Sequence, residues 1–184
     1  KAGCNHIYLG LESGSPKIQK MIKKNIDNSK IKTAVRLARK AGIETTVYFM
    51  AGFPEETEED LMQSVNAMKD IKPDHAIWSI LTPYPGTEIW DLARKQGLVS
   101  LDTDWARFFH HSSRNIFNTM SEKSWEKMIK IIDREQKKLN GRITLIKLKK
   151  KIRANINLAK MAIRNPGKVL KQFKKIPAMF LKKR

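Results

Sequence analysis

Short apolar runs alternate with amphipathic stretches over the first hundred residues of the chain. Three of the runs are typical of buried strands, because they are short and mostly apolar; they lie at 7–11, 45–51 and 75–81. Between and after these runs, apolar residues recur every three or four positions, as on one face of a helix. The alternation predicts an α/β fold whose parallel strands are joined by right-handed crossovers, and three strands form an open half-sheet.

Local signals place the ends of the predicted helices. Pro16 suits a first helical position, because its missing N–H would be unpaired there. Asp27, Asn28 and Ser29 are N-cap candidates for one helix and Thr57 caps the next, where three acidic residues follow it at the positive end of the helix dipole. Gly42 and Gly97 stand where two helices end, since glycine adopts the left-handed conformation at low cost.

Two further helices are predicted after residue 100. Ser121 caps the first, which runs to about Leu139 and carries an apolar stripe expected to dock on the body of the protein. A second amphipathic helix follows Gly141, restarts at Pro166 and continues to Pro177. The chain then divides into a body, a connecting segment with its docking helix, and a tail: 1–100, 101–140 and 141–184.

Composition narrows the class of protein. The 184 residues, 41% of them hydrophobic, are enough for one core. The single cysteine, Cys4, excludes a disulfide scaffold, and we expect it to be a small core residue. Neither a membrane-spanning run nor a signal peptide is visible, so we expect a cytoplasmic protein. Because the chain lacks an initiator Met and begins almost at once with a strand, we expect a fragment of a longer protein.

The net charge of +19 is unevenly distributed. Residues 1–135 carry 20 basic and 18 acidic side chains, whereas residues 136–184 carry 17 basic side chains and no acidic one. Cationic amphipathic helices bind anionic membrane surfaces, which would make the protein peripheral at a membrane. A solvated helical hairpin and an RNA-binding tail are the alternatives. Nucleic acid is the less favoured partner, because Phe173 and Phe180 are the only aromatic residues of the tail that bases could stack on.

Chemistry-bearing residues follow each predicted strand. In parallel α/β folds ligands bind beyond the carboxyl ends of the strands, and the segments found there are 12–15, 52–57 and 82–87. Glu12 suits a ribose or an amino acid, although an isolated carboxylate is more often a helix cap or a surface group. Gly52 lets a flat ring approach the backbone, or it serves a plain turn. Tyr84 offers a face for stacking an adenine, or it packs within its loop.

The order and spacing of three motifs are more specific than any one of them. The chain resembles the radical S-adenosylmethionine superfamily, in particular its cobalamin-binding branch, which includes the anaerobic magnesium-protoporphyrin ester cyclases. The matching segments are GLESGSPKIQKMIKKN, YFMAGFPEET and LTPYPGTEIW, at 10–25, 48–57 and 81–90. This resemblance covers residues 2–139. It implies the C-terminal half of a partial (β/α)6 TIM-like barrel, followed by a helical C-terminal extension.

The resemblance also implies roles for single residues. Glu12 and Ser13 match the position that contacts the ribose and methionine part of S-adenosylmethionine, and Lys24 matches a basic position that pairs with its carboxylate. The other implied cofactor-binding positions lie against or beside the adenine or end the second motif: Met50, Gly52, Pro54, Glu56, Tyr84 and Pro85. Without the resemblance, Glu56 would serve only to favour the helix dipole. Two residues depart from the family, since Glu55 and Asn25 stand where it usually has glycine.

The CxxxCxxC motif that holds the family's four-iron cluster is absent, because one cysteine cannot supply three thiolates. His110 and His111 are adjacent and point apart, so we expect a structural or substrate-facing role for them and no metal site in the chain. We infer that the cluster and a cobalamin domain lie in a missing N-terminal part and that this chain alone is inactive.

Three functions remain open at this point. In the first, the intact enzyme cleaves S-adenosylmethionine at its reduced cluster to a 5′-deoxyadenosyl radical, which abstracts hydrogen from a hydrophobic small molecule such as a tetrapyrrole or lipid. The second is a tRNA-modifying radical enzyme whose basic tail contacts phosphates. The third is a non-enzymatic α/β binding module.

Overall fold

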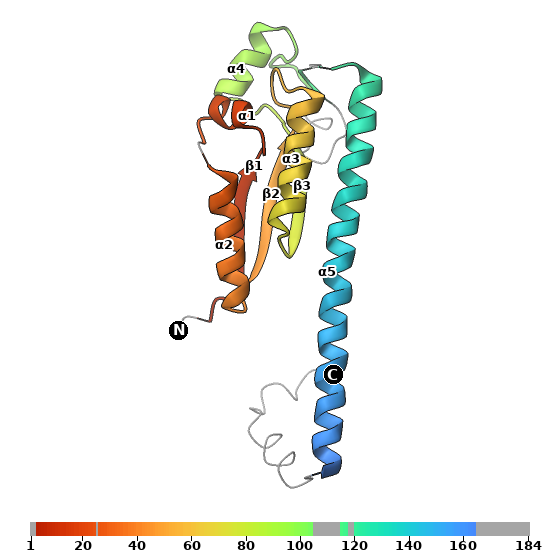
Figure 1. Cartoon of the computed structure of the whole chain (residues 1–184). Helices are drawn as coiled ribbons and strands as arrows, with labels where there is room; N and C mark the ends of the chain where they lie inside the picture. The colour runs from red at the N-terminus through yellow and green to blue at the C-terminus, as the bar shows by residue number, and fades with distance from the viewer. Residues whose placement is uncertain (1–2, 25, 105–114, 118–119, 165–184) are drawn as a thin grey trace. The chain divides into compact units, whose positions relative to one another are not determined.

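Helices and strands alternate along the chain in a computed structural model that describes residues 3–24, 26–104, 115–117 and 120–164 (Figure 1). The elements are, in chain order, β1 (His6–Glu12), α1 (Pro16–Met21), α2 (Asn28–Lys40), β2 (Glu44–Ala51), α3 (Glu58–Ile71), β3 (His75–Ile80), α4 (Glu88–Lys95) and α5 (Glu122–Arg164). The three predicted strands and the helices between them are confirmed. The partial barrel remains a proposal.

The three strands form one parallel sheet in the order β1-β2-β3. Val47 in the central strand is level with Leu9 on one side and with Ala76 on the other. The register of β1 shifts between Gly10 and Glu12, where a bulge interrupts the ladder. All three strands therefore end at the same edge of the sheet, and β1 reaches that edge with an irregular backbone.

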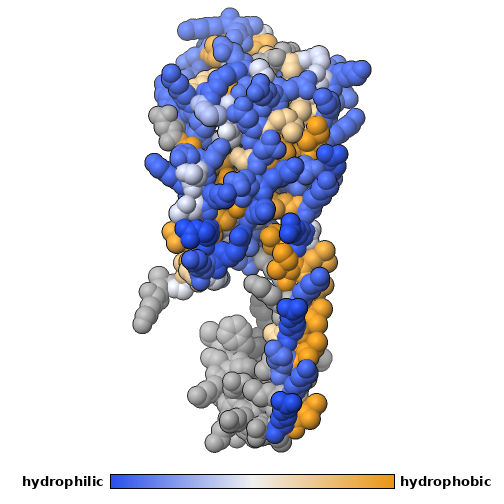
Figure 2. Space-filling view, in the orientation of Figure 1, coloured by the Kyte–Doolittle hydropathy of each residue, from blue (hydrophilic) through white to orange (hydrophobic). Residues whose placement is uncertain are grey.

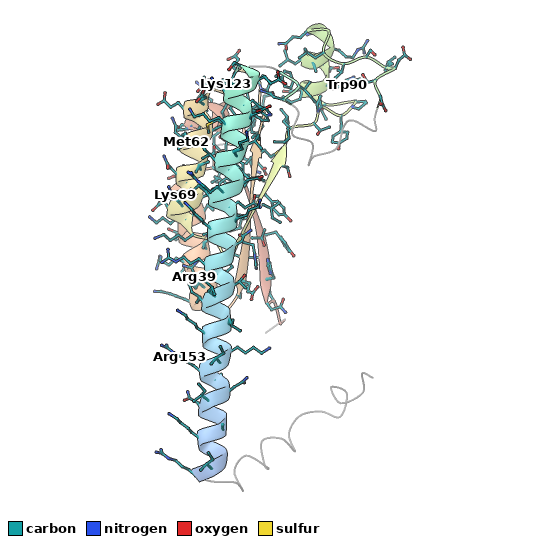
Figure 3. The ribbon with its side chains drawn as sticks, turned by 90° about the vertical axis from the view of Figure 1, so that its right-hand side faces the viewer. Arg39, Met62, Lys69, Trp90, Lys123 and Arg153 are labelled. Carbon is teal, nitrogen blue, oxygen red and sulfur yellow. The ribbon has the colours of Figure 1, made fainter. Side chains whose placement is uncertain are left out.

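The two faces of the sheet differ in cover. Helices α2 and α3 lie over one face (Figure 1), and the residues pointing to it form the main core with α5; the buried members include Leu11, Val47, Phe49, Trp78, Leu61, Met68, Trp125 and Met128. Side chains of the opposite face project on the side away from α2 and α3 (Figure 3). On that face Tyr8 is 64% exposed, and its ring stacks against those of His6 and Tyr48.

The predicted capping of α3 is confirmed. The Thr57 hydroxyl accepts the backbone N–H of Asp60, and the Asp60 carboxylate accepts the backbone N–H of Thr57, which makes a reciprocal capping box. Asp27 caps α2, because its carboxylate accepts the backbone N–H of Ser29. The starts of these helices could therefore be predicted from short polar side chains, which accept the free N–H groups of the first helical turn.

Beyond Leu139 the predicted helix end is wrong. A single helix, α5, continues through Gly141 to Arg164, where we expected one helix to stop and another to start. A glycine inside a helix costs only about 1 kcal/mol, and no proline lies between Gly141 and Pro166 to break the hydrogen bonding. Ser121 caps α5 as predicted, since its hydroxyl accepts the N–H of Ser124.

The chain forms two compact units, Lys1–Gly141 and Arg142–Arg184. Within the part of the chain that the structure describes, no helix is long and apolar enough to cross a membrane. Several sequence predictions fall outside the described residues and concern Asn25, His110, His111 and the segment after Asn165.

Cys4 is exposed, so the prediction of a small core residue is wrong. It precedes β1, the first strand of the sheet, and neither core cluster includes it. Its thiol contacts the backbone carbonyl of His6 at 3.5 Å. An isolated cysteine in the sequence carries no sign of whether an element will cover it.

Candidate functional site

Three loops meet at the carboxyl edge of the sheet, at 12–15, 52–57 and 82–87. Side chains within or next to these loops share a second core cluster, whose buried members include Ile18, Phe53, Leu81 and Trp90. The Lys17 ammonium also donates to the carbonyl of Glu55 at 2.6 Å, which ties the first loop region to the second. The edge is thus built jointly by segments that are distant in sequence.

An ion pair between Glu12 and Lys24 lies at this edge. Lys24 Nζ donates to Glu12 Oε1 at 2.6 Å. The Lys24 side chain is only 31% exposed and the Glu12 side chain only 20%. Glu12 has a φ of 66°, a left-handed conformation that is rare outside glycine and that occurs where the bulge re-aims the strand end. Backbone strain at a half-buried charged pair is typical of a ligand site.

Gly10 makes room for that pair. A Cβ atom at this position would overlap the Glu12 carboxylate and would lie 2.9 Å from Lys24 Nζ. In the sequence Gly10 is only the first residue of a motif. Its lack of a side chain matters because the Lys24 side chain lies beside it, and this contact cannot be read from the sequence.

Ser13 lies in the interior and has 0% exposure. Its hydroxyl is hydrogen-bonded to that of Ser64 in α3 at 3.0 Å and accepts the N–H of Ser15. The neighbouring N–H of Gly14 donates to the same Ser64 hydroxyl at 2.8 Å. In this structure Ser13 fastens the first loop to α3, and its predicted contact with a ligand stays a prediction.

Buried Gln19 shapes the same loop. Its amide Nε2 donates to the carbonyl oxygens of Leu11 and Ser13, at 2.6 and 2.7 Å. These two carbonyls flank Glu12, so the hydrogen bonds hold its left-handed backbone in place. Sequence reasoning missed Gln19, because a glutamine on the buried side of a short helix leaves no pattern.

Glu56 organises the second loop from inside. It is fully buried, and its Oε2 accepts the N–H groups of Gly52 at 2.6 Å and Phe53 at 3.3 Å. Burial raises the pKa of this carboxyl to about 8, although the two N–H groups oppose the shift. In this structure the Glu56 carboxyl closes the turn and, with this pKa, stays protonated at neutral pH. Its predicted contact with a cofactor stays a prediction.

Gly52 has a φ of 91°, which explains why a glycine stands there. The side on which a Cβ would project is covered by Trp125, Ile80 and Asn115, at 3.5 to 3.7 Å. A flat ligand would therefore have to approach this backbone from another side than the one we expected. Asn115, which no sequence pattern marked, is buried here, and among the described residues neither of its side-chain polar atoms has a hydrogen-bond partner.

Asp60 joins the first and second loops. Its carboxylate accepts hydrogen bonds from Ser15 at 2.6 Å, from Lys17 at 2.9 Å and from Thr57 at 2.8 Å. Burial would raise the pKa of this carboxyl, but these hydrogen bonds together outweigh burial and hold the pKa well below its usual range. Asp60 thus provides a fixed negative charge between the loops, where the sequence showed only an acidic residue in the first turn of a helix.

The remaining predicted residues differ in exposure. Pro54 is buried and Met50 is half-buried against the second core cluster. Tyr84 is 48% exposed and Pro85 is exposed, so this loop presents its side chains outward. Glu55, which stands where the family usually has glycine, has a φ of 58°. The left-handed turn is therefore kept despite the departure.

A hollow of about 770 Å³ lies along the surface of α5, away from these loops in the chain; it is lined by Lys123, Ser124, Glu126, Lys127, Lys130, Ile131 and Arg134. None of the predicted cofactor-binding residues lines it. A single helix supplies all of these side chains, whereas specific small-molecule sites are concave and draw on several elements. The hollow is therefore a poor candidate for a small-molecule site.

The donor set for a metal is absent from the part of the chain described. No three His, Cys, Asp or Glu side chains among these residues are grouped closely enough to hold a metal ion. The chain has one cysteine in all, and that residue is exposed. A thiolate-held iron–sulfur cluster does not fit this chain's own residues.

Comparison with known proteins finds one matching family and several relatives. The model of the Radical SAM superfamily matches residues 1–68, which include the first loop, the second loop and most of α3. An uncharacterized methyltransferase from Pyrococcus horikoshii is 36% identical over 108 residues, or 59% of this chain and 23% of that protein.

Two relatives have named reactions. The anaerobic magnesium-protoporphyrin IX monomethyl ester cyclase of Cereibacter sphaeroides is 36% identical over 52% of this chain and 16% of its own length. The tRNA-2-methylthio-N(6)-dimethylallyladenosine synthase of Pseudomonas savastanoi pv. phaseolicola is 34% identical over 47% of this chain and 20% of its own length. The chain spans less than a quarter of the length of each of these relatives. The chain is thus similar to the radical SAM superfamily over its first 68 residues and to these relatives over about half of its length.

Proposed function

We propose that this chain is the S-adenosylmethionine-binding half of a radical SAM enzyme whose remaining part lies in a longer protein. The observation that carries the proposal is the half-buried Glu12–Lys24 pair at the carboxyl edge of the sheet, in a chain whose residues 1–68 match the Radical SAM superfamily. Ligands of parallel α/β folds bind at that edge.

The pair fits the charged end of S-adenosylmethionine. The Lys24 ammonium can donate to the ligand's carboxylate, and the Glu12 carboxylate can accept from its ammonium group or from ribose hydroxyls. Lys24 Nζ and Glu12 Oε1 are 2.6 Å apart, so the two charges balance each other. The charged groups of the ligand would take the place of this contact when it binds. We assign the adenine side to Met50, to the backbone around Gly52 and Pro54, and to the Tyr84–Pro85 loop.

The iron–sulfur cluster and any cobalamin belong to another part of the longer protein. This assignment rests on the single exposed cysteine of the chain and on the small share of each relative's length that the chain covers. It follows that the chain alone does not catalyse the reaction. The roles of its own residues are to bind and orient S-adenosylmethionine.

The open face of the sheet favours a flat, hydrophobic substrate. Tyr8 and Tyr48 stack with ring centroids 6.0 Å apart, and Tyr8 is 64% exposed on the face opposite to α2 and α3. Aromatic rings bind other rings through offset stacking and area burial. A tetrapyrrole, the class of molecule named for the ester cyclase relative, has this shape. We therefore propose a tetrapyrrole-like or lipid-like substrate. A cobalamin-dependent reaction is a separate proposal, supported by the methyltransferase named among the relatives.

A tRNA substrate is the second candidate. It is supported by the synthase relative named for tRNA and by the 17 basic residues without an acidic one at 136–184. Such a segment can neutralise phosphates, and its binding would then fall steeply with salt. The open aromatic face is the reason for ranking it second.

The test uses the longer protein, reconstituted with its cluster and reduced under anaerobic conditions. We expect 5′-deoxyadenosine to form faster with magnesium-protoporphyrin monomethyl ester than with tRNA. Glu12→Gln should lower the rate more than tenfold, whereas Asp70→Asn, which removes a carboxylate from the exposed Lys32–Asp70 pair, should not. Stimulation by tRNA alone would establish the second candidate, and no 5′-deoxyadenosine with any substrate would leave a non-enzymatic binding module.

A further inference from the structure

The segment Arg142–Arg164 of α5 carries an uncovered apolar stripe. Five large apolar side chains on one side of it are between 47% and 83% exposed, and they are Leu145, Leu148, Ile152, Ile156 and Ile163. Ala159, also exposed, falls on the same line. In Figure 2 hydrophobic atoms lie along one side of this segment and hydrophilic atoms along the other. Contiguous exposed apolar surface of this kind marks an interaction site.

The spacing of the stripe fits a flat partner. From Leu145 to Ile163 its six positions cover 18 residues in five steps, an average of 3.6 residues per step. A stripe with this period stays on one side of a straight helix, which can lie along a planar surface. The period of a coiled-coil seam, 3.5 residues, differs too little over this length to identify the partner, so the charges have to do so.

The charges of the segment identify the kind of surface. Residues 142–164 contain eight Lys or Arg and no Asp or Glu. Arg153 lies next in sequence to Ile152, and both side chains are exposed. An apolar stripe bordered by cations matches the interface of a membrane, where apolar side chains enter the acyl boundary and cations meet anionic headgroups.

We propose that Arg142–Arg164 lies in the plane of a membrane and binds the headgroups of anionic lipids, which would bring the enzyme to a membrane-held substrate. RNA is the competing partner for a basic helix. Sequence-tolerant RNA binding relies on aromatic stacking, and residues 142–164 contain no aromatic residue. RNA would also leave the apolar stripe uncovered, whereas a membrane covers it.

The experiment is flotation of the purified 184-residue chain with vesicles. One set of vesicles contains phosphatidylcholine with 30% phosphatidylglycerol, and the other contains phosphatidylcholine alone. We expect binding to the anionic set, at least tenfold weaker binding to the neutral set, and a decrease with added salt.

Two neighbouring residues provide a matched pair of variants. Ile156→Asp places a carboxylate on the apolar stripe, and Asn157→Asp places the same charge one position away, on the polar side. Both residues are exposed, and circular dichroism checks that both variants keep the helix. We expect Ile156→Asp to weaken vesicle binding at least tenfold more than Asn157→Asp.

Three results would overturn the proposal. Equal loss in the two variants would mean that only net charge matters, equal binding to neutral vesicles would remove the role of the cations, and tighter binding to tRNA than to anionic vesicles at the same salt concentration would favour the nucleic-acid partner. None of these results bears on the Glu12–Lys24 site, which lies in the other compact unit.

Discussion

Glu56 and Asp60 are two carboxyl groups four residues apart with opposite behaviour. Glu56 is surrounded by protein. One of its carboxyl oxygens accepts two backbone N–H groups, and the other has no hydrogen-bond partner among the described residues. Asp60 receives hydrogen bonds from Ser15, Lys17 and Thr57. Burial dominates at Glu56 and raises its pKa to about 8, whereas hydrogen bonds dominate at Asp60 and lower its pKa. The loops of the site thus rest on one neutral and one charged carboxyl.

The raised pKa of Glu56 predicts a pH dependence of stability. The unfolded chain ionises this group near its ordinary pKa of 4.5, and the folded chain keeps it protonated up to about pH 8. The folded state binds the extra proton between these values, so the stability that this group contributes is complete below pH 4.5 and falls as the pH rises to 8. The loss should be roughly 3–5 kcal/mol.

Glu56→Gln checks this prediction. The amide oxygen can still accept the N–H groups of Gly52 and Phe53, and the side chain has no proton to lose. Urea unfolding at pH 5 and pH 8 should show a smaller decrease in stability for the variant than for the native chain. An identical decrease in both proteins would mean that Glu56 is ionised in the fold.

At the scale of the elements, the first loop and α3 are in direct contact at Gly14. A Cβ at this position would lie 2.6 Å from the carbonyl oxygen of Gln63 and 2.8 Å from the Cα of Ser64. These are backbone atoms of a helix and cannot rotate away. The contact brings Ser13 and Ser15 to their partners Ser64 and Asp60, so the close approach positions the loop that carries Glu12.

Gly14→Ala should therefore destabilise the protein by about 1–3 kcal/mol, because the helix has to move away from the sheet. Gly141→Ala is the matched control. Gly141 lies inside α5 with no atom near its Cβ position, and an alanine there should stabilise the helix by up to about 1 kcal/mol. Thermal unfolding followed by circular dichroism measures both. A stable Gly14→Ala variant would contradict the close packing.

Elements were predictable because they depend on neighbours in sequence. The strand runs, the caps at Asp27 and Thr57 and the parallel order all follow from local pattern, and the structure confirms them. The contacts of Gln19 and Asn115 could not be predicted, since they depend on which segments meet at the sheet edge. The extent of α5 was mispredicted because Gly141 was read as a stop signal although its cost inside a helix is small.

At the scale of the whole chain, two units with different charge carry two separate tasks. Lys1–Gly141 has 22 basic and 18 acidic residues and contains the candidate ligand site. Arg142–Arg184 has 15 basic residues and no acidic one. In the first unit charges of both signs are available for local ion pairs such as Glu12–Lys24. In the second unit the excess of positive charge favours binding to a large negatively charged surface.

The most direct test of the ligand site is the dissociation constant for S-adenosylmethionine, measured by titration calorimetry on the longer protein. Lys24→Met removes the ammonium proposed to pair with the ligand's carboxylate, and Lys32→Met removes one from the exposed pair with Asp70. The loss of a charge-assisted hydrogen bond costs about 1.5–3 kcal/mol, so Lys24→Met should raise the dissociation constant roughly 10- to 100-fold. Lys32→Met should leave it unchanged. Native affinity in the Lys24→Met variant would contradict the site.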